Sequence, residues 1–333
     1  MFVPLRSLLC CGVVAVVGAG CPVPPLDGQS PREGEGEGES NEGEGEIGES
    51  CAFDDDTGFP APLTTRTDRI GSAETFDVAA WNIRNFPRSG SNTIATVADV
   101  ITSLDLDLVS VEEIEDEASF NQLLARLPEH EGVLSTDSYS DGSYQKLGFI
   151  YRCGRLTPTN VALIFTGDGF NFPRPPLQVQ FRYDDGDRAF DFAAISVHFK
   201  AQGDADSIAR RREAFLRLEA YVDSLVEGPA GPDEIVILGD FNERLDEPSG
   251  ASNWRPFLDA TKYVVRTQPL SDRGEVSFLS GTNAILDHIV TTRAFDEEVG
   301  AGTALIPRID SDIANYRDDV SDHRPVALIL RGL

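Results

Sequence analysis

The chain has 333 residues and a formal net charge of −28 at pH 7. Its first fifty residues hold nine acidic residues and two arginines, a net −7, which leaves −21 on the other 283 residues. A protein that binds a polyanion through a broad basic face would have a positive net charge. Any site of this protein that binds a polyanion therefore has to be local. The chain is long enough to bury one large core.

The N-terminus has the features of an export signal, predicted over residues 1–21. Arg6 supplies a positive charge, residues 8–17 are apolar, and Gly18-Ala19-Gly20-Cys21 places small residues before a cysteine. The apolar run is too short to span a bilayer. The last four residues resemble a bacterial lipobox, although Gly18 stands where leucine is usual. Two outcomes stay open: a lipoprotein anchored at Cys21, facing the periplasm or the exterior, and a freely secreted protein.

Residues 22–52 are predicted to be a disordered linker. Glycine and glutamate alternate between Glu33 and Glu46, a composition that has nothing to bury and repels itself. The linker would hold the following domain, residues 53–333, away from a membrane, or would act as a solubilising tail. Cys51 and Cys153 lie beyond the export signal and could form one disulfide in an oxidising compartment, although the sequence does not fix their distance.

From residue 76 onward, strand patterns and helix patterns follow one another. Strands are predicted over residues 76–86, 106–114, 147–152, 177–183, 189–198, 234–240, 275–279, 284–290 and 326–330. Helices are predicted over 92–104, 118–127 and 206–226. Many strands that pair with their neighbours, with few helices between them, predict an α+β fold: an α/β sandwich of two packed, mainly antiparallel β-sheets flanked by helices. An α/β barrel fits less well, because several neighbouring strands look like hairpins.

The predicted strand over residues 234–240 ends in Gly239-Asp240-Phe241-Asn242. Because alternate side chains of a strand point the same way, Asp240 and Asn242 would be offered to one site. A carboxylate beside such an apolar run is costly to bury without a partner. Taken alone, the segment could also be a strand-end turn closed by an Asx hydrogen bond.

Seven further polar residues of the same kind lie at or just beyond the ends of predicted strands. Together with Asp240 the set comprises Asn82, Glu113, His198, Asn242, Asp287, Asp322 and His323. Carboxylates and amides are the oxygen ligands preferred by Mg²⁺, Mn²⁺ and Ca²⁺, and the histidines lack the spacing of a zinc site. Two imidazoles beside a hard cation suit the hydrolysis of a phosphate ester.

Six short motifs occur in the order found in the endonuclease/exonuclease/phosphatase superfamily. They are Trp81-Asn82-Ile83-Arg84, Val111-Glu112-Glu113-Ile114, Val197-His198-Phe199-Lys200, Gly239-Asp240-Phe241-Asn242, Leu286-Asp287-His288-Ile289 and Ser321-Asp322-His323-Arg324-Pro325-Val326. The chain from Phe76 to its end resembles a secreted bacterial relative of deoxyribonuclease I. The two-layer β-sandwich of that family agrees with the fold predicted from the strand patterns.

The resemblance implies a role for each residue of the set. Glu113 would be the main metal ligand, with Asn82 and Asp322 nearby. Asp240 would orient or deprotonate the attacking water, helped by Asn242.

The same resemblance implies that His198 and His323 bind and neutralise the scissile phosphate. Asp287 would fix the tautomer of His323 and raise its pKa. Arg174 resembles a phosphate-contacting arginine of the family. Tyr144 matches its phosphate-side tyrosine, with Tyr139 as the alternative.

Other polar residues receive structural or undecided interpretations. Glu112 stands where the family commonly has glutamine, and strand alternation favours the side opposite Glu113. His288 is predicted to be structural, and His130, in a Pro-Glu-His-Glu segment, to be a solvated surface residue. Arg210-Arg211-Arg212 could be a phosphate-binding patch or a solvated helix face paired with nearby acids.

The resulting hypothesis is an exported phosphodiesterase that uses Mg²⁺, with Mn²⁺ or Ca²⁺ as alternatives, and most resembles a DNA endonuclease. DNA is the expected partner, the membrane is contacted only through lipid at Cys21, and no protein partner is predicted. A phosphatase or a phospholipid phosphodiesterase of the inositol-phosphate or sphingomyelinase type is the alternative within the superfamily. A catalytically inactive surface binding module is the alternative outside enzymes.

Overall fold

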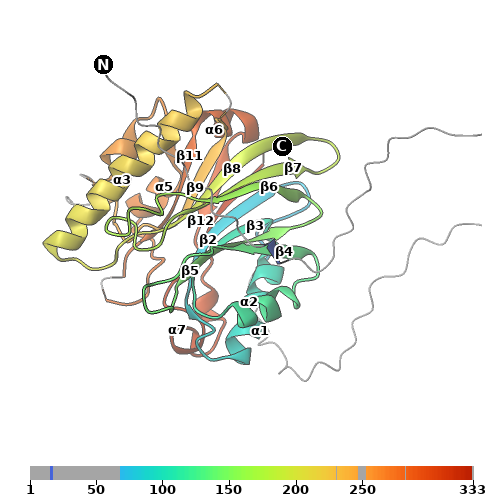
Figure 1. Cartoon of the computed structure of the whole chain (residues 1–333). Coiled ribbons are helices and arrows are strands. Elements are labelled where there is room, and N and C mark those ends of the chain that lie inside the picture. The colour runs from blue at the N-terminus through green and yellow to red at the C-terminus, as the bar shows by residue number, and fades with distance from the viewer. Residues whose placement is uncertain (1–15, 18–67, 230, 247–252, 282, 332–333) are drawn as a thin grey trace, which may run out of the picture.

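A computed structural model describes residues 16–17, 68–229, 231–246, 253–281 and 283–331 (Figure 1). Two β-sheets pack face to face, and helices cover their outer faces. In these ranges, no helix is both long enough and apolar enough to cross a membrane. The predicted linker, Cys21, Cys51 and all of the predicted export signal except residues 16–17 lie outside the described residues.

The first sheet has its parallel pair, β2 and β3, near the centre. Its order is β1 (Val16–Val17), β4 (His130–Leu134), β5 (Lys146–Arg152), β3 (Leu108–Ile114), β2 (Phe76–Phe86), β13 (Val326–Leu330) and β12 (Gly302–Leu305). All neighbours other than β2 and β3 are antiparallel. The two-residue β1 falls within the predicted export signal.

The second sheet repeats this plan, with β8 and β9 as its parallel pair. Its order is β10 (Tyr263–Val265), β11 (Asp287–Thr292), β9 (Ile235–Asp240), β8 (Ala189–His198), β7 (Leu177–Asp184) and β6 (Leu156–Leu163). The remaining pairs are antiparallel. The predicted sandwich of two mainly antiparallel sheets is confirmed.

Helices seal the outer faces of both sheets (Figure 1). Helices α1 (Ser91–Leu104) and α2 (Glu117–Leu124) pack on the first sheet, and α3 (Ala205–Val226) packs on the second. The shorter helices are α5 (Gln268–Asp272), α6 (Arg293–Val299), α7 (Tyr316–Asp319) and the 3₁₀ turns η1 (Arg255–Leu258) and η2 (Ile309–Ser311).

Strand alternation divides the apolar residues between three cores. In β2, Val78 and Ala80 face the other sheet, whereas Ala79 and Trp81 face the helices outside. All four are completely buried. A strand buried on both faces reads as a continuous apolar run, which is why these central strands were predictable.

The parallel pairs determine where the polar strand ends meet. Strands β2, β3, β8 and β9 run toward one edge of the sandwich and end there at or near Asn82, Glu113, His198 and Asp240. The antiparallel β11 starts at the same edge with Asp287, which pairs with Asp240. The eight polar residues identified in the sequence can therefore meet at one edge of the sandwich.

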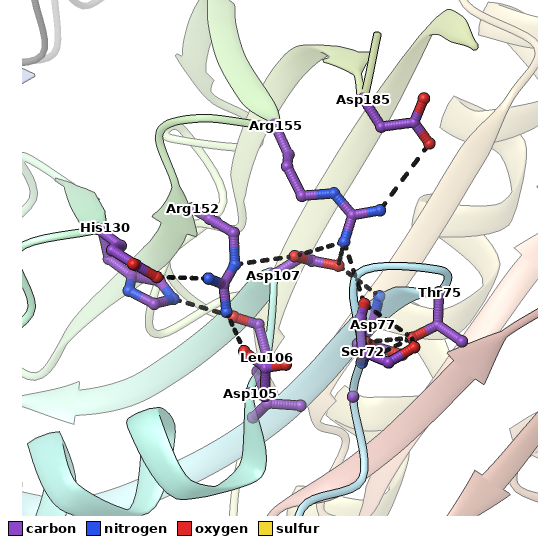
Figure 2. Close-up of polar contacts among 12 residues, drawn as sticks. Ser72, Thr75, Asp77, Asp105, Leu106, Asp107, His130, Arg152, Arg155 and Asp185 are labelled. Atoms are coloured by element: carbon purple, nitrogen blue, oxygen red, sulfur yellow. Dashed lines mark hydrogen bonds and ion pairs between the residues drawn. The ribbon is translucent and has the colours of Figure 1, made fainter. Parts of the chain in front are cut away.

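The opposite end of the sandwich is closed by charged residues (Figure 2). Asp107 is 1% exposed and accepts from Arg152 Nε at 3.1 Å and from Arg155 Nη1 at 2.8 Å. His130 lies beside this network, with its Nε2 2.9 Å from the Leu106 carbonyl oxygen. The interpretation of His130 as a solvated residue is wrong: it opens β4 and is buried.

The other differences from the predicted strands concern elements with weak sequence patterns. Residues 275–279 do not form a strand, and only Phe278 makes isolated bridges, to Ala284 and His323. Strands β4, β6, β10 and β12 were not predicted. They are short or interrupted by glycine or proline, and β6 also lies half exposed at a sheet edge.

Candidate active site

Asp240 lies at the centre of the polar cluster. Its Oδ2 atom accepts a hydrogen bond from Asn82 Nδ2 at 3.2 Å. The same oxygen lies 3.6 Å from His198 Nε2 and 3.9 Å from His323 Nε2. Its Oδ1 atom accepts from the backbone N–H of Asn242 at 2.8 Å, which fixes the carboxyl orientation. One oxygen therefore faces both imidazoles, as a group that handles a proton near a phosphate would.

Asn82 connects Asp240 to the predicted metal ligand. Its Nδ2 also donates to Glu113 Oε1 at 3.2 Å, and the backbone N–H of Asn85 donates to Glu113 Oε2 at 3.0 Å. Glu113 Oε1 lies 3.8 Å from His198 Nε2. Residues from β2, β3, β8 and β9 thus meet in one cluster.

Two local backbone features aim these side chains. Glu113 has φ of +63°, in the left-handed region, where the β2–β3 and β3–β5 registers are both interrupted. Gly239 has φ of +140°, and a Cβ there would lie 2.1 Å from the Val197 carbonyl oxygen. Only glycine allows β9 to approach β8 this closely beside Asp240.

Asp287 holds His323 on the other side of Asp240. The Asp287 Oδ2 atom lies 2.8 Å from His323 Nδ1 and accepts from the Ser277 hydroxyl at 2.6 Å. Burial opposes a charge on the ring, but Asp287, helped by Asp240 and Asp322, raises the pKa of His323 to about 10. His323 is therefore a cation at neutral pH, with its Nε2 directed toward Asp240.

The two other central groups are tuned differently. Burial, together with the nearby Arg174 and His323, holds the pKa of His198 well below its ordinary value of 6.5. Burial, to which Asp287 adds, raises the pKa of Asp240 to about 7 against the opposing effect of His323. The site thus combines a neutral imidazole, a charged imidazole and a carboxyl group that can exchange a proton near neutral pH.

Glu112 does not lie on the side that alternation favours. Its carboxyl group is completely buried and accepts from Ser110 Oγ at 2.6 Å, and Ser110 also bonds to Ser196 of the second sheet. Burial raises the pKa of Glu112 well above its ordinary value, and Asp287 and Asp240 add to the effect. The left-handed residue Glu113 interrupts the alternation, so both glutamates belong to the site side of β3.

The residue set fits a divalent cation. Side-chain atoms of Asp240, Asp287 and His323 lie within 4.8 Å of one another. Because a charged His323 has a proton on each ring nitrogen, the two carboxyl groups are the donors of this group. Within the described ranges, neither Asp240, Asp287 nor Glu113 has a lysine or arginine at ion-pair distance, and the buried Asp287 Oδ1 atom has no hydrogen-bond partner. The charged His323 balances part of this negative charge, and the remaining oxygen donors suit Mg²⁺ or Mn²⁺. Glu113 and Asn82 extend this donor set.

Three of the predicted residues lie around this centre with partners of their own. Asp322 pairs with Arg84, whose Nη1 is 2.9 Å from Oδ2. Arg174 donates to the carbonyl oxygens of His198 at 3.3 Å and Phe199 at 3.0 Å, which places it beside His198. Tyr144 accepts from the backbone N–H of Glu117 at 3.3 Å.

Tyr139, the alternative to Tyr144, is the tyrosine that contacts Arg174. Its hydroxyl accepts from Arg174 Nη1 at 3.5 Å and donates to Gln145 Oε1 at 3.3 Å. Arg174 Nη1 also donates to the same Gln145 oxygen. Gln145 was not among the predicted residues.

His288 is structural, as expected from its position. Its Nδ1 lies 2.8 Å from Thr267 Oγ1 and its Nε2 lies 3.0 Å from the Glu243 carbonyl oxygen. Burial lowers the pKa of His288 to about 4, against the opposing effect of Asp287. The ring is a neutral part of the core behind Asp240.

The three consecutive arginines of α3 have three different environments. Arg211 is buried and donates to Glu243 Oε2 at 2.8 Å. Arg212 donates to Asn253 at 3.1 Å, and Arg210 donates to the Phe170 carbonyl oxygen at 2.6 Å. The three arginines therefore form neither a solvated face paired with nearby acids nor a single phosphate-binding patch.

Two groups that support the site were missed in the sequence. Ser277, which lies beside the start of β11, donates to Asp287, and the Trp81 indole donates to the His323 carbonyl oxygen at 3.2 Å. Trp81 stands directly before Asn82 in a recognised motif, a signal that could have identified it. Ser277 has no such signal, because its contact with Asp287, ten residues further along the chain, depends on the fold.

Comparison with known proteins places this geometry in a family. The family model described as "Endonuclease/Exonuclease/phosphatase family" matches residues 79–323. A comparison with curated protein sequences found no match.

Solved structures share the fold at low sequence identity. D. rerio TDP2 in complex with a single-strand DNA product has 12% identity and a TM-score of 0.56, covering 77% of this chain and 98% of that one. The human Nocturnin catalytic domain has 16% identity and a TM-score of 0.55, covering 77% and 92%. The Bacteroides thetaiotaomicron mannosyl-6-phosphatase Bt3783 has 14% identity and a TM-score of 0.56, covering 77% and 99%.

The family match runs from β2 to His323 and includes every strand end that contributes to the cluster around Asp240. With its double-sheet fold and its buried Asp240, Asp287 and His323, this chain belongs to the endonuclease/exonuclease/phosphatase family and is one of its phosphoesterases.

Proposed function

We propose that this protein is a divalent-metal-dependent phosphodiesterase that cleaves DNA as an endonuclease outside the cytoplasm. The observation that carries the hydrolytic part is the position of Asp240 Oδ2, which faces Asn82, His198 and His323 within 3.2 to 3.9 Å. A carboxylate with a raised pKa between two imidazoles can accept a proton from water while a neighbouring cation meets the phosphate.

The roles of the residues follow from these contacts. Asp240 takes the proton of the attacking water, and the Asn242 N–H holds the carboxyl group in place. His323, kept charged by Asp287, donates from Nε2 to a phosphoryl oxygen as negative charge develops. The lowered pKa of His198 keeps its ring neutral and makes it a weaker base than Asp240, so it can donate one N–H to the phosphate while Asp240 accepts the proton of the water.

Glu113, Asn82 and Asp322 would hold the metal, with Asp240 close by. A bound Mg²⁺ or Mn²⁺ supplies charge to polarise the phosphoryl group and stabilise the leaving oxygen. Arg174, beside His198, and Tyr144 or Tyr139 are the proposed phosphate contacts of the protein itself.

DNA is preferred among the substrates of this family for two reasons. The Leu286-Asp287-His288-Ile289 segment differs from the Trp-Cys-Asp-Arg motif of inositol polyphosphate 5-phosphatases. The structurally similar TDP2 was solved with a single-strand DNA product. Because Bt3783, with a comparable TM-score, is a mannosyl-6-phosphatase, a sugar phosphate is the competing substrate.

Nicking of supercoiled plasmid in Mg²⁺, in Mn²⁺ and in EDTA tests the proposal. We expect conversion to open circles with either metal and none in EDTA. Mannose 6-phosphate, an inositol phosphate and sphingomyelin should be hydrolysed at least a hundredfold more slowly per enzyme. Turnover of one of these without nicking would replace DNA as the substrate, and binding without any turnover would indicate an inactive module.

The proposed location is the exported side of the membrane, with lipid on Cys21. Cys153 is disulfide-bonded, and every other cysteine of the chain lies outside the described residues. Detergent phase partitioning of the expressed full chain tests the anchor. Wild type should enter the detergent phase, and Cys21→Ala should enter the aqueous phase. If both proteins enter the aqueous phase, the protein is freely secreted and not anchored by lipid.

A further inference from the structure

Phe170 is an exposed aromatic residue on the segment between β6 and β7. Its side chain is 67% exposed, more than any other large hydrophobic side chain in the described ranges. The ring is nevertheless held in place: Arg210 Cζ lies 4.6 Å from its centroid, and Arg210 Nε donates to the Phe170 carbonyl oxygen at 2.6 Å. Because the guanidinium group covers one face, the exposed area belongs to the other face and the ring edge.

The segment that carries Phe170 is attached beside the active site. Phe172, two residues later, is buried and packs edge-to-face on Phe199 at 5.9 Å between ring centroids. Arg174 then donates to the carbonyl oxygens of His198 and Phe199. A short, anchored stretch of chain thus connects the exposed ring to the residues that flank the proposed scissile phosphate.

Cations lie along this connection without carboxylate partners. In the described part of the chain, Lys200, Arg174 and Arg210 form no ion pair, although the protein as a whole carries a charge of −28. Burial, together with the nearby Arg210 and Arg174, lowers the pKa of Lys200, and Asp204 opposes this effect. Like charges are kept close in an acidic protein at a cost that an anionic ligand would relieve.

We propose that Phe170, Arg210 and Lys200 form a nucleotide subsite next to the scissile phosphate, in which a base stacks on the open face of Phe170. The adjacent phosphate of the strand would lie between Lys200 and Arg174. The subsite rests on the proposed nuclease function and specifies it, because a sugar phosphate has no base to stack. Stacking on an aromatic ring accepts any base, so the subsite would position a strand without reading its sequence.

The competing interpretation is that Arg210 and Phe170 only tie the β6–β7 segment to α3. Both interpretations predict some loss of stability when the ring is removed. Only the subsite predicts that DNA affinity depends on having an aromatic ring at position 170. It alone also predicts that Lys200 contributes to the salt dependence of binding.

The first experiment measures binding of a fluorescein-labelled single-stranded 12-mer by anisotropy in a His198→Ala background. Phe170→Ala and Phe170→Leu should each raise Kd about 5- to 100-fold, and Phe170→Trp should keep it within about threefold of the background. Leu258→Ala, which removes an exposed leucine of η1, is the matched control and should leave Kd unchanged. Equal Kd values for Phe170→Leu and Leu258→Ala would overturn the subsite.

The second experiment does not depend on how well the Phe170 variants fold. Lys200→Gln should lower the slope of log Kd against log salt by about 0.7, the value for one phosphate contact on a single strand. Lys262→Gln makes the same charge change at a lysine paired with Asp223 and should not alter the slope. Equal slopes for the two variants would remove Lys200 from the subsite.

Turnover separates failure of the subsite from failure of the nuclease proposal. In otherwise wild-type enzyme, Phe170→Ala should lower at least fivefold the ratio of kcat/KM for the 12-mer to kcat/KM for methyl 4-nitrophenyl phosphate, which has no base. If wild type cleaves DNA and the ratio stays constant, the subsite alone is wrong. If wild type hydrolyses the small diester but neither binds nor cleaves DNA, both proposals are wrong.

Discussion

The carboxyl group of Asp240 has two distinct oxygens. Oδ1 is fixed by the Asn242 N–H, and Oδ2 faces Asn82 and the two imidazoles. Replacement by asparagine keeps the size and the hydrogen bond to Oδ1 but removes the ability to accept a proton. We expect Asp240→Asn to lower kcat by about 10³-fold or more.

The fold should tolerate this substitution, because it removes a buried carboxyl group whose pKa is already raised by burial. The midpoint of thermal unfolding without metal should stay the same or rise. Single-turnover cleavage of plasmid by both proteins checks the prediction. Activity within tenfold of wild type would show that a group other than Asp240 accepts the proton of the attacking water.

Glu113 has a different task, since it bonds to Asn82 and to a backbone N–H but has no cationic partner in the described ranges. We expect Glu113→Gln to weaken Mg²⁺ binding at least tenfold, because one charged oxygen ligand is lost. The readout is thermal unfolding against Mg²⁺ concentration, in which a bound ion raises the midpoint by mass action. Superimposable titrations for wild type and variant would contradict the metal assignment.

At the scale of elements, β9 and β8 approach so closely that Gly239 has no room for a side chain. A Cβ would meet the Val197 carbonyl oxygen at 2.1 Å, and φ of +140° is unfavourable for alanine. We expect Gly239→Ala to cost about 3 kcal/mol of unfolding free energy, through strain and separation of the strands.

Any Gly239→Ala protein that folds should also lose most of its activity, because Asp240 follows directly. Gly167→Ala is the matched control, since a Cβ there meets no atom within 4 Å. Urea unfolding of the three proteins gives the comparison. A cost below about 1 kcal/mol would show that the two strands can separate easily.

The central strands and the residues at their ends could be predicted because each pattern is local. An apolar run such as 235–238 followed by glycine and a carboxylate indicates both a buried strand and its polar end. Glu112 could not be placed in this way, because the left-handed conformation of Glu113 depends on how β3 meets its neighbours. The prediction for His130 was wrong for a similar reason. Its neighbours in sequence are polar, but its hydrogen-bond partner, the Leu106 carbonyl oxygen, is distant along the chain.

At the scale of the whole molecule, buried carboxyl groups lie at both ends of the sandwich. One end has the catalytic cluster, and the other has Asp77 and Asp107 beside Arg152 and Arg155 (Figure 2). Asp107 is paired with both arginines, whereas Asp77 bonds to the Thr75 hydroxyl and the Ser72 N–H, and its Oδ1 has no partner in the described ranges. Asp77 is therefore the carboxyl group whose ionisation should matter for stability.

Burial raises the pKa of Asp77 from its ordinary 3.8 to about 7, and Asp107 adds to the effect, while Thr75, Ser72 and Arg155 oppose it. The folded state therefore holds this proton more tightly than the unfolded state. The associated stability is complete below pH 3.8 and is lost as the pH rises through 7. In Asp77→Asn the side chain stays neutral, so this loss should disappear.

When the pH is raised from 5 to 8.5, we expect the unfolding free energy of wild type to fall by about 2–3 kcal/mol relative to that of Asp77→Asn. Asp187→Asn makes the same change in charge at an exposed turn and should follow the wild-type pH dependence. Urea unfolding at both pH values, in EDTA, keeps metal binding at the other end out of the comparison. Parallel curves for wild type and Asp77→Asn would mean that the network around Asp107 and Arg155 stabilises the Asp77 carboxylate despite its burial, so that the two ends of the sandwich differ in charge as well as in chemistry.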